Sequence, residues 1–327
     1  MPSLSAITID VHLADGDLQA ALERDVRDGL RRYPKSIPPT WFYDEEGSRL
    51  FEEITRLPEY YPTRAERALL ERHSDEIASF SDADVLVELG AGSCDKTRIL
   101  LDAMAELDSL RRYVPFDVSA EFLEDAATGL SREYGGLQVH AVIGDFLRHL
   151  DRIPSTGRRL VAFLGGTIGN LVPAQRKRFF RALRATMSPV DRLLVGADLV
   201  KDSSRIVAAY DDSAGVTAKF NRNVLRVLNR SLDADFAPER FAHVVRWNAR
   251  EEWIEMHLRA LAPQTVTVGA LGLIVRFDED EELLTEVSAK FTPHRLAAEL
   301  RQAGFRIDHQ WGAEEGEFLL TLAAPRD

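Results

Sequence analysis

The segment Val85–Thr97 limits the possible folds more than any other part of this chain. It begins with the mostly apolar run Val85–Leu89, which is typical of a strand buried on both faces of a parallel sheet. The run breaks at Gly90–Gly92, and an amphipathic helix is predicted over 95–107. A strand, a glycine-rich turn and a helix N-terminus bring backbone N–H groups and the positive end of the helix dipole against a ligand. The segment therefore predicts an α/β protein with a ligand site at this turn.

Two further motifs follow at the ends of predicted strands. Asp117 ends a second apolar stretch roughly 20–30 residues after the turn, where nucleotide-binding α/β folds place the acid that binds ribose hydroxyls. The tripeptide GDF, which contains Asp145 and Phe146, follows the predicted strand 138–143. Asp145 could accept a hydrogen bond from an adenine amino group, and Phe146 offers a ring face and its backbone. The ordered set of turn, Asp117 and GDF predicts a nucleoside site.

S-adenosylmethionine matches this site better than a dinucleotide does. In the dinucleotide fingerprint G-x-G-x-x-G the third glycine is replaced here by Asp95, and an acid one position before Lys96 would repel phosphate. S-adenosylmethionine has no phosphate, but it carries a carboxylate that Lys96 could pair with. The pattern acid-x-Gly-x-Gly, formed by Glu88, Gly90 and Gly92, suits this cofactor. We therefore expect S-adenosyl-L-methionine as the cofactor.

Strands and helices alternate from about residue 84 to residue 198. Strands are predicted over 85–89, 112–117, 138–143, 159–164 and 192–197, and helices over 95–107, 119–134 and 173–187. After an interruption, a helix is predicted over 293–303 and a hairpin over 306–310 with 317–322. This order predicts an α/β fold with a doubly wound, seven-stranded, Rossmann-like sheet that ends in an antiparallel hairpin, as in methyltransferases that use S-adenosylmethionine.

The interruption indicates two domains. Residues 65–198 and 291–327 would form the methyltransferase domain that binds the cofactor, and residues 1–64 and 199–290 a second, α+β domain for substrate recognition. Within the second domain the patterns indicate helices over 202–210 and 216–229 and antiparallel strands over 253–277.

Composition excludes several classes of function. The formal net charge of −12 opposes a nucleic-acid partner, and no apolar run approaches the roughly 18 residues that a membrane span needs. The single cysteine, Cys94, excludes an internal disulfide, and the eight histidines lack the spacing of a metal site. No signal-peptide pattern begins the sequence. We expect a cytoplasmic, monomeric enzyme that binds a small molecule and no metal, membrane or nucleic acid.

Longer motifs, which cover nearly the whole chain, indicate a particular family. In order they read PKSIPPTWFYDEEGSRLFEEITRLPEYYPTRAE, LVELGAGSCDKTRILLDA, FLGGTIGNL, DLVKD, AYDD, AGVTAKFNRNVL and LLTEVSAKF. With these motifs the chain resembles the L-histidine Nα-methyltransferases of ergothioneine biosynthesis, actinobacterial type. The resemblance implies an enzyme that transfers three methyl groups from S-adenosylmethionine to the α-amine of L-histidine, giving hercynine in the first step of that pathway.

The resemblance also implies roles for individual residues. The residues that would bind the cofactor are Gly90, Lys96, Asp117, Asp145 and Phe146. The residues that would bind the substrate are Tyr60, Asn170, Tyr210, Met256, Glu286 and Ser288. Tyr43 would act as the catalytic residue beside the amine that is methylated.

Within the substrate set the implied contacts make chemical sense. Asn170 and Tyr210 would bind the carboxylate, and Glu286 and Ser288 would hydrogen-bond the imidazole, with Tyr60 nearby. A neutral imidazole carries one donor and one acceptor, which a carboxylate and a hydroxyl can satisfy together.

Two other classes of function fit parts of the sequence. The segment Gly165–Gly169 lies between a strand and a helix, as the G-x-S-x-G elbow of hydrolases does, although its central residue is Thr167. The same pocket could also serve a non-catalytic amino-acid or nucleoside sensor. Within the methyltransferase class, another amino acid could be the acceptor.

Single residues also have plainer interpretations. Asn170 could cap the helix that begins near Pro173, and Tyr210 could anchor a helix to the core. Glu286 could be a surface charge in an acidic stretch, and Met256 could be core filler.

Overall fold

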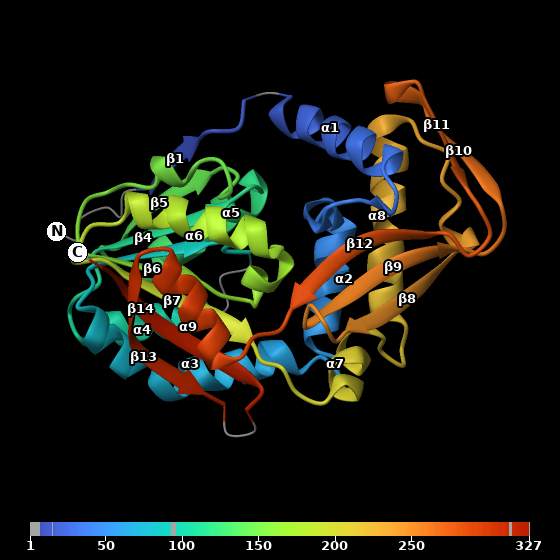
Figure 1. Cartoon of the computed structure of the whole chain (residues 1–327). Helices are drawn as coiled ribbons and strands as arrows, with labels where there is room; N and C mark the ends of the chain where they lie inside the picture. Colours follow the sequence, from blue (N-terminus) through green and yellow to red (C-terminus); the bar gives the residue numbers. More distant parts are fainter. Residues whose placement is uncertain (1–6, 15, 93–95, 314–315, 327) are drawn as a thin grey trace. The chain divides into compact units, whose positions relative to one another are not determined.

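A computed structural model describes residues 7–14, 16–92, 96–313 and 316–326. The chain forms two compact units (Figure 1), each built from more than one stretch of sequence. Unit 1 comprises Met1–Ala14, Ala65–Leu199 and Phe291–Asp327, and unit 2 comprises Asp15–Arg64 and Val200–Lys290.

Unit 1 is built on an eight-stranded sheet. In chain order its strands are β1 (Ile7–Val11), β3 (Val85–Leu89), β4 (Arg112–Asp117), β5 (Gln138–Ile143), β6 (Arg159–Phe163), β7 (Arg192–Asp198), β13 (Phe305–Gly312) and β14 (Phe318–Pro325). Their order in the sheet is β1-β5-β4-β3-β6-β7-β14-β13. The strands from β1 to β7 pair in parallel, whereas β14 runs antiparallel to both β7 and β13. The chain builds outward from β3 in one direction and then in the other, so the strand order reverses beside β3.

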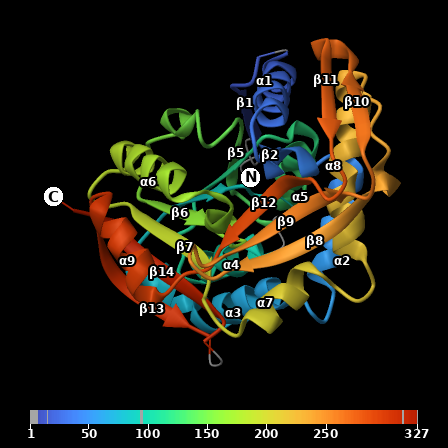
Figure 2. The same cartoon turned by 45° about the vertical axis from the view of Figure 1, so that its right-hand side comes forward.

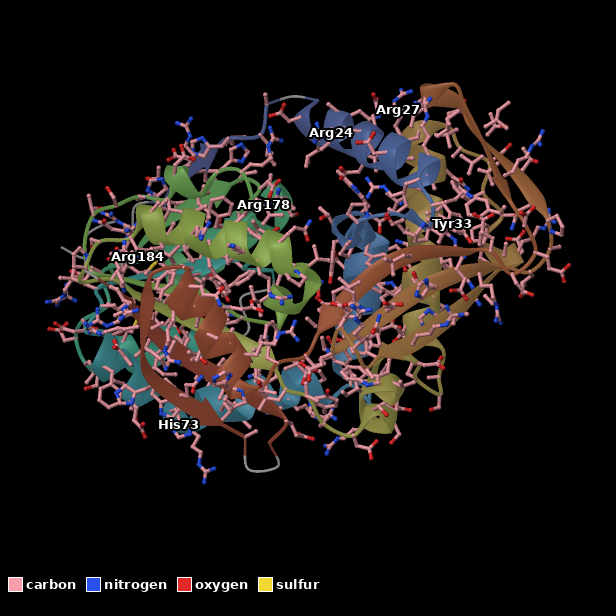
Figure 3. The ribbon with its side chains drawn as sticks, in the orientation of Figure 1. Arg24, Arg27, Tyr33, His73, Arg178 and Arg184 are labelled. Atoms are coloured by element: carbon pink, nitrogen blue, oxygen red, sulfur yellow. The ribbon has the colours of Figure 1, made fainter. Side chains whose placement is uncertain are left out.

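Helices cover this sheet on both faces (Figure 1). The helices of unit 1 are α3 (Tyr61–Ser81), α4 (Thr97–Glu106), α5 (Ala120–Glu133), α6 (Pro173–Thr186) and α9 (Pro293–Gln302), with short 3-10 turns η2 (Leu150–Arg152) and η3 (Thr167–Asn170). Because helices lie over both faces, β3 and β6 are buried at every position, as their mostly apolar sequences indicate. Arg184, labelled in Figure 3, lies on α6 and donates a hydrogen bond to the Gly304 carbonyl at 3.1 Å, just before β13.

The predicted fold class is confirmed, with one addition. The seven expected strands are present, including the antiparallel hairpin, but β1 extends the sheet by pairing with β5 from Ile7↔Val139 to Val11↔Ile143. The sequence analysis grouped the whole of 1–64 with substrate recognition, whereas this strand places the first residues in unit 1. In this strand Ile7, Ile9 and Val11 alternate with Thr8 and Asp10, a period-2 pattern that could have indicated it, although most of its side chains are exposed.

Unit 2 contains a four-stranded sheet and a separate hairpin (Figure 2). The sheet has the order β2-β12-β9-β8, formed by β2 (Lys35–Ser36), β8 (Phe241–Asn248), β9 (Trp253–Ala260) and β12 (Glu282–Ala289). The hairpin pairs β10 (Gln264–Val268) with β11 (Leu273–Phe277). The antiparallel strands expected over 253–277 are confirmed, but β8 and β12 lie outside that range.

The helices of unit 2 pack around one apolar core. They are α1 (Asp17–Arg31), α2 (Glu45–Thr55), α7 (Ser203–Tyr210) and α8 (Val216–Leu232), with the 3-10 turns η1 (Pro39–Phe42), η4 (Pro238–Arg240) and η5 (Gly269–Leu271). Helix α8 buries a stripe that includes Phe220, Val224 and Leu228, whose spacing of four residues places them on one face. Asp44 caps the N-terminus of helix α2, and its carboxylate accepts a hydrogen bond from the Gly47 amide at 2.7 Å.

A buried ion pair ties β6 to β7 and generates a first prediction. Arg159 Nη2 lies 2.6 Å from Asp191 Oδ2, and both side chains are almost fully buried. Replacing Asp191 by Ala leaves an uncompensated buried guanidinium, so the free energy of unfolding should fall by about 3–5 kcal/mol in urea denaturation. Glu71→Ala removes an exposed pair with Arg67, at 3.8 Å, and should cost less than ~1 kcal/mol. Equal losses in the two variants would contradict this account.

Candidate active site

The turn after β3 forms an open cradle at the carboxyl edge of the sheet. Gly90 and Gly92 have φ angles of +73° and +51°, which side-chain-bearing residues rarely adopt. A Cβ atom added to either glycine would meet no heavy atom within 4 Å, so the backbone is open to a ligand here. The Gly90 amide donates to the Phe116 carbonyl at 2.8 Å, which fixes the turn against the end of β4.

Asp117 lies beside this turn, as the sequence analysis expected. Its carboxylate accepts hydrogen bonds from the amides of Gly92 at 3.2 Å and Ser119 at 3.1 Å. Burial raises the pKa of Asp117, while these backbone donors act in the opposite direction. A carboxylate offers about four acceptor positions, so acceptor capacity remains for the hydroxyl groups of a ligand.

Asp145 and Phe146 follow β5, the neighbour of β4, and so belong to the same edge of the sheet. The Asp145 carboxylate accepts from the Leu147 amide at 2.8 Å, and the Asp145 amide donates to His149 Nδ1 at 3.1 Å. The Phe146 ring packs edge-on against Phe163, with the ring centroids 5.4 Å apart. Both residues are therefore held in place by local contacts before any ligand arrives.

Lys96 precedes α4 and is oriented by a carboxylate that the sequence analysis missed. Glu66, on α3, is fully buried; its two carboxylate oxygens accept from the Gly165 amide at 2.8 and 2.9 Å, and it pairs with the Lys96 ammonium. An ammonium has three donors, so this pair leaves hydrogen-bonding capacity for a second carboxylate. The helical spacing could have indicated that Glu66 is buried, because it shares the buried face of α3 with Leu69 and Leu70.

Glu88, the acid of the acid-x-Gly-x-Gly pattern, holds the turn from beneath. Its carboxylate accepts from the Tyr113 hydroxyl at 2.6 Å and from the Thr97 hydroxyl, which links β3 to β4 and to the first residue of α4. Burial raises the pKa of Glu88 to about 7, and the two hydroxyl donors counteract this shift.

A nucleoside that carries a carboxylate fits this edge of unit 1. The open glycine turn admits close backbone approach, Asp117 and Asp145 supply acceptors, and Lys96 supplies a cation. Asp95, on which the sequence argument against a phosphate group depended, lies outside the described residues.

Unit 2 gathers a second polar set at the end of β12. Glu286, Ser288 and Lys290 alternate along the chain, which places them on one face of the extended segment, and all three are buried. The Ser288 hydroxyl lies 2.8 Å from the Tyr210 hydroxyl at the end of α7. Met256 of β9 is the cross-strand partner of Glu286 and is also buried. Lys290 and four residues implied by the resemblance therefore lie on neighbouring elements of one unit.

Glu286 is unusual among these residues because it is a carboxyl group in an apolar setting. Burial raises the pKa of Glu286 to about 7, and the positive charge of Lys290 lowers it in part. Both the acid and the carboxylate form are thus accessible near neutrality. The interpretation of Glu286 as a surface charge is wrong, since its side chain is buried.

Tyr60 and Tyr43 continue the second set through ring contacts. The Tyr60 ring is buried and packs edge-on against the Tyr210 ring, with centroids 6.1 Å apart, and against Phe51 at 6.2 Å. Tyr43 follows η1 and is 45 % exposed; its ring packs edge-on against Phe51 at 5.7 Å and Phe220 at 5.6 Å. These contacts order the two tyrosines by apolar packing.

Asn170 lies in unit 1, at the end of η3. The residue that caps α6 is Val172, so the interpretation of Asn170 as the helix cap is wrong. In the same loop the Thr167 hydroxyl donates to the Leu164 carbonyl at 2.9 Å, which commits it to the backbone and argues against a hydrolase nucleophile. The single cysteine, Cys94, lies outside the described residues.

A histidine in unit 2 that sequence reasoning did not identify holds Tyr210 in place. His243 Nε2 donates to the Tyr210 carbonyl at 2.9 Å, and its Nδ1 accepts from the Asn221 side-chain amide at 2.8 Å. These partners define a neutral ring, and burial lowers the pKa of His243 accordingly. The signal in sequence was weak, since His243 lies on β8, a strand that the patterns did not reveal.

The described residues contain neither a metal site nor a helix that could span a membrane. Among residues 7–14, 16–92, 96–313 and 316–326, no group of three or more His, Cys, Asp or Glu side chains is arranged to hold a metal ion. Within the same part of the chain, no helix combines the length and apolar character required to cross a membrane.

The strand order and the cradle at the carboxyl edge define an S-adenosylmethionine-dependent methyltransferase. Comparison with known proteins narrows this class. Residues 22–325 match the family described as histidine-specific, S-adenosylmethionine-dependent methyltransferases, and the chain belongs to this family. The protein is accordingly an enzyme that uses S-adenosylmethionine, as the sequence analysis predicted.

Relatives of high identity are similar over nearly their full length. The histidine N-alpha-methyltransferase of Mycobacterium tuberculosis is 56% identical over 318 residues, which cover 97% of this chain and 99% of the relative. The enzyme of the same name from Mycolicibacterium smegmatis is 56% identical over 95% of this chain and 97% of its own length. A more distant relative, ergothioneine biosynthesis protein 1 of Neurospora crassa, is 29% identical over 88% of this chain and 33% of its own length.

The raised pKa of Glu286 generates a prediction about stability. Its folded-state value of about 7 exceeds the ordinary 4.5, so between these values the folded protein binds more protons than the unfolded chain. Wild-type protein should therefore lose stability relative to Glu286→Gln as pH rises from about 4.5 to 7, by up to ~3 kcal/mol, and should level off above that. Urea denaturation across pH 5–8 measures the difference. Glu279→Gln, an exposed change in the same unit, provides the baseline, and a pH-independent difference for Glu286→Gln would contradict the assignment.

Proposed function

We propose that this enzyme transfers three methyl groups from S-adenosylmethionine to the α-amine of L-histidine and so produces hercynine, the first step of ergothioneine biosynthesis. The family and the two relatives at 56% identity support this activity. The observation that carries it is the buried polar set of unit 2, in which the Tyr210 and Ser288 hydroxyls lie 2.8 Å apart, both accept from the Lys290 ammonium, and Ser288 shares strand β12 with the buried Glu286 carboxyl group. Such buried groups suit a small zwitterion with a polar ring.

The imidazole ring is assigned to Glu286 and Ser288. A neutral imidazole offers one N–H donor and one nitrogen acceptor. Ser288 can serve one ring nitrogen, and Glu286, poised between acid and carboxylate, can serve the other. Met256, the cross-strand partner of Glu286, would pack against the ring, and Tyr60 would close the aromatic side of the pocket.

The substrate carboxylate is assigned to Tyr210 and Asn170, and the amine to Tyr43. A hydroxyl and a side-chain amide are both donors, as a carboxylate needs. Methyl transfer requires an unprotonated amine, and removing the ammonium from water lowers its pKa. Tyr43 positions the amine and transfers the proton of the amine to water, which can reach Tyr43 because its side chain is partly exposed. With the ring and the carboxylate both fixed, only the amine can react.

The cofactor is assigned to unit 1, to Gly90, Lys96, Asp117, Asp145 and Phe146. Lys96 would pair with its carboxylate, Asp117 would accept from the ribose hydroxyls, Asp145 would accept from the adenine amino group, and Phe146 would line the base. S-adenosylmethionine, when bound, supplies an electrophilic methyl group on a sulfonium. The chain's own contribution is to hold that group and to exclude phosphate-bearing nucleotides such as NAD.

We also propose that the enzyme acts in the cytoplasm as a monomer and without nucleic acid. The formal net charge of −12 supports the last point, because binding a phosphate backbone requires a basic face.

Product analysis tests the proposed activity. The purified protein is incubated with excess S-adenosylmethionine and a mixture of the twenty amino acids, and new masses are followed with time. We expect histidine to gain three methyl groups on one nitrogen while both ring nitrogens stay free, because the reaction stops when the amine has no lone pair. Methylation of the imidazole, a halt at one methyl, or preference for another amino acid would each overturn the proposal.

Asp117 supplies a test of the cofactor site. Asp117→Ala should weaken S-adenosylmethionine and S-adenosylhomocysteine alike by about ten- to hundredfold, since both carry the same ribose and a hydrogen bond to a charged group is worth roughly 1.5–3 kcal/mol. Isothermal titration calorimetry measures both affinities. Asp151→Ala, an exposed change in the same unit, should leave them unchanged. Normal affinity for both ligands in Asp117→Ala would place this carboxylate outside the pocket.

A further inference from the structure

Lys290 is a buried cation inside the polar set of unit 2, and neither the motifs nor the family resemblance gave it a role. It follows β12 directly, and its side chain has no exposed surface. Its ammonium donates to the Tyr210 hydroxyl at 2.8 Å and to the Ser288 hydroxyl at 2.9 Å. Those two oxygens are themselves 2.8 Å apart, so the three polar atoms form a closed triangle.

The triangle restricts where the hydroxyl hydrogens can point. An ammonium donates and never accepts, so Lys290 occupies one acceptor position on each oxygen. The contact between Tyr210 and Ser288 uses one of the two hydroxyl hydrogens, and the other points out of the triangle. Two arrangements are therefore available, and they differ in which hydroxyl donates outward.

A substrate carboxylate selects between these arrangements. A phenol is more acidic than an alcohol and is the better donor to a carboxylate, so Tyr210 donates outward and Ser288 donates to Tyr210. Ser288 then has no hydrogen left and meets the ring as an acceptor, which requires an N–H on that side of the ring. Glu286, two residues earlier on the same face, then serves the second ring nitrogen as the protonated acid, because that nitrogen accepts a hydrogen bond and carries no hydrogen.

We propose that Lys290 is a positioning residue for the amino-acid substrate: its ammonium occupies one acceptor position on the Tyr210 and Ser288 hydroxyls, so that when a substrate carboxylate takes the Tyr210 hydrogen, Ser288 is left as the acceptor for a ring N–H. This inference rests on the proposed function, because it takes the ligand to be histidine. The positive charge has a second effect, since it offsets the charge that a substrate carboxylate brings into a buried pocket.

Substitution of Lys290 separates positioning from simple packing. Lys290→Met keeps most of the side chain's volume and removes the charge and all three donors. We expect histidine affinity, measured by calorimetry in the presence of S-adenosylhomocysteine, to fall by about ten- to hundredfold, while S-adenosylhomocysteine affinity stays unchanged. Lys219→Met, the same change at an exposed position of α8, should leave both affinities unaltered. Lys290→Arg, which keeps the charge and donors, should recover part of the loss.

The ratio of histidine affinity to histamine affinity distinguishes positioning by Lys290 from a purely structural role, which would weaken both ligands equally. Histamine keeps the imidazole and amine of histidine but lacks the carboxylate, so it makes no use of the outward Tyr210 donor. Lys290→Met should therefore weaken histidine binding by at least fivefold more than histamine binding. In the background of Tyr210→Phe, adding Lys290→Met should change this ratio by less than about twofold, because the lysine acts on the carboxylate through Tyr210.

The possible outcomes distinguish this inference from the proposed function. A wild-type enzyme that neither binds nor methylates histidine overturns the proposed function, and this inference with it. A wild type that binds histidine, beside a folded Lys290→Met variant with equal affinity or with equal losses for histidine and histamine, overturns the inference alone. Far-ultraviolet circular dichroism and thermal unfolding check that the variant is folded. If Lys290→Met does not fold, Lys290→Gln, which is polar and neutral, carries the same comparison with the same criteria.

Discussion

A carboxylate that leaves water needs hydrogen-bond donors, and the carboxyl edge of the sheet in unit 1 is organised by this requirement. Glu88 is buried and accepts from Tyr113 and Thr97, which joins β3, β4 and the start of α4 around the glycine turn. Glu66 is equally buried and accepts from the Gly165 amide, which joins α3 to the loop after β6. Both acids are committed to hydrogen bonds within the chain, and they hold the segments around the glycine turn in place.

In unit 2 the buried carboxyl group is accompanied by a cation. Glu286 and Lys290 are buried near the hydroxyls of Tyr210 and Ser288, and the ammonium takes part in the hydroxyl network as well as balancing charge. Burying ionised groups rarely adds stability, because desolvation offsets the attraction between them. The arrangement is better explained by recognition, since buried polar groups that a ligand must satisfy reject ligands that leave them unpaired.

Sequence patterns predicted the parts of the molecule that depend on local order. The run at Val85–Leu89, the glycine turn and Asp117 lie where the α/β rhythm placed them, because a strand, a turn and the next strand end are fixed by nearby residues. Strand β12 was not located, since its pairing with β9 involves residues far along the chain and a register shift between Leu284 and Glu286. The substrate residues on β12 came from family resemblance and not from periodicity.

The residues that sequence reasoning missed act on other residues rather than on a ligand. Glu66 orients Lys96, and Lys290 orients two hydroxyls, so each takes its meaning from a long-range contact. The same distinction bears on selectivity for the ring. An imidazole can satisfy both a buried hydroxyl and a buried carboxyl group, whereas an indole has one N–H and no acceptor and would leave one of them unpaired. Selectivity in the proposed pocket therefore depends on how firmly Ser288 and Glu286 are held. The Lys290 ammonium hydrogen-bonds the Ser288 hydroxyl, and its charge lowers the pKa of Glu286 in part.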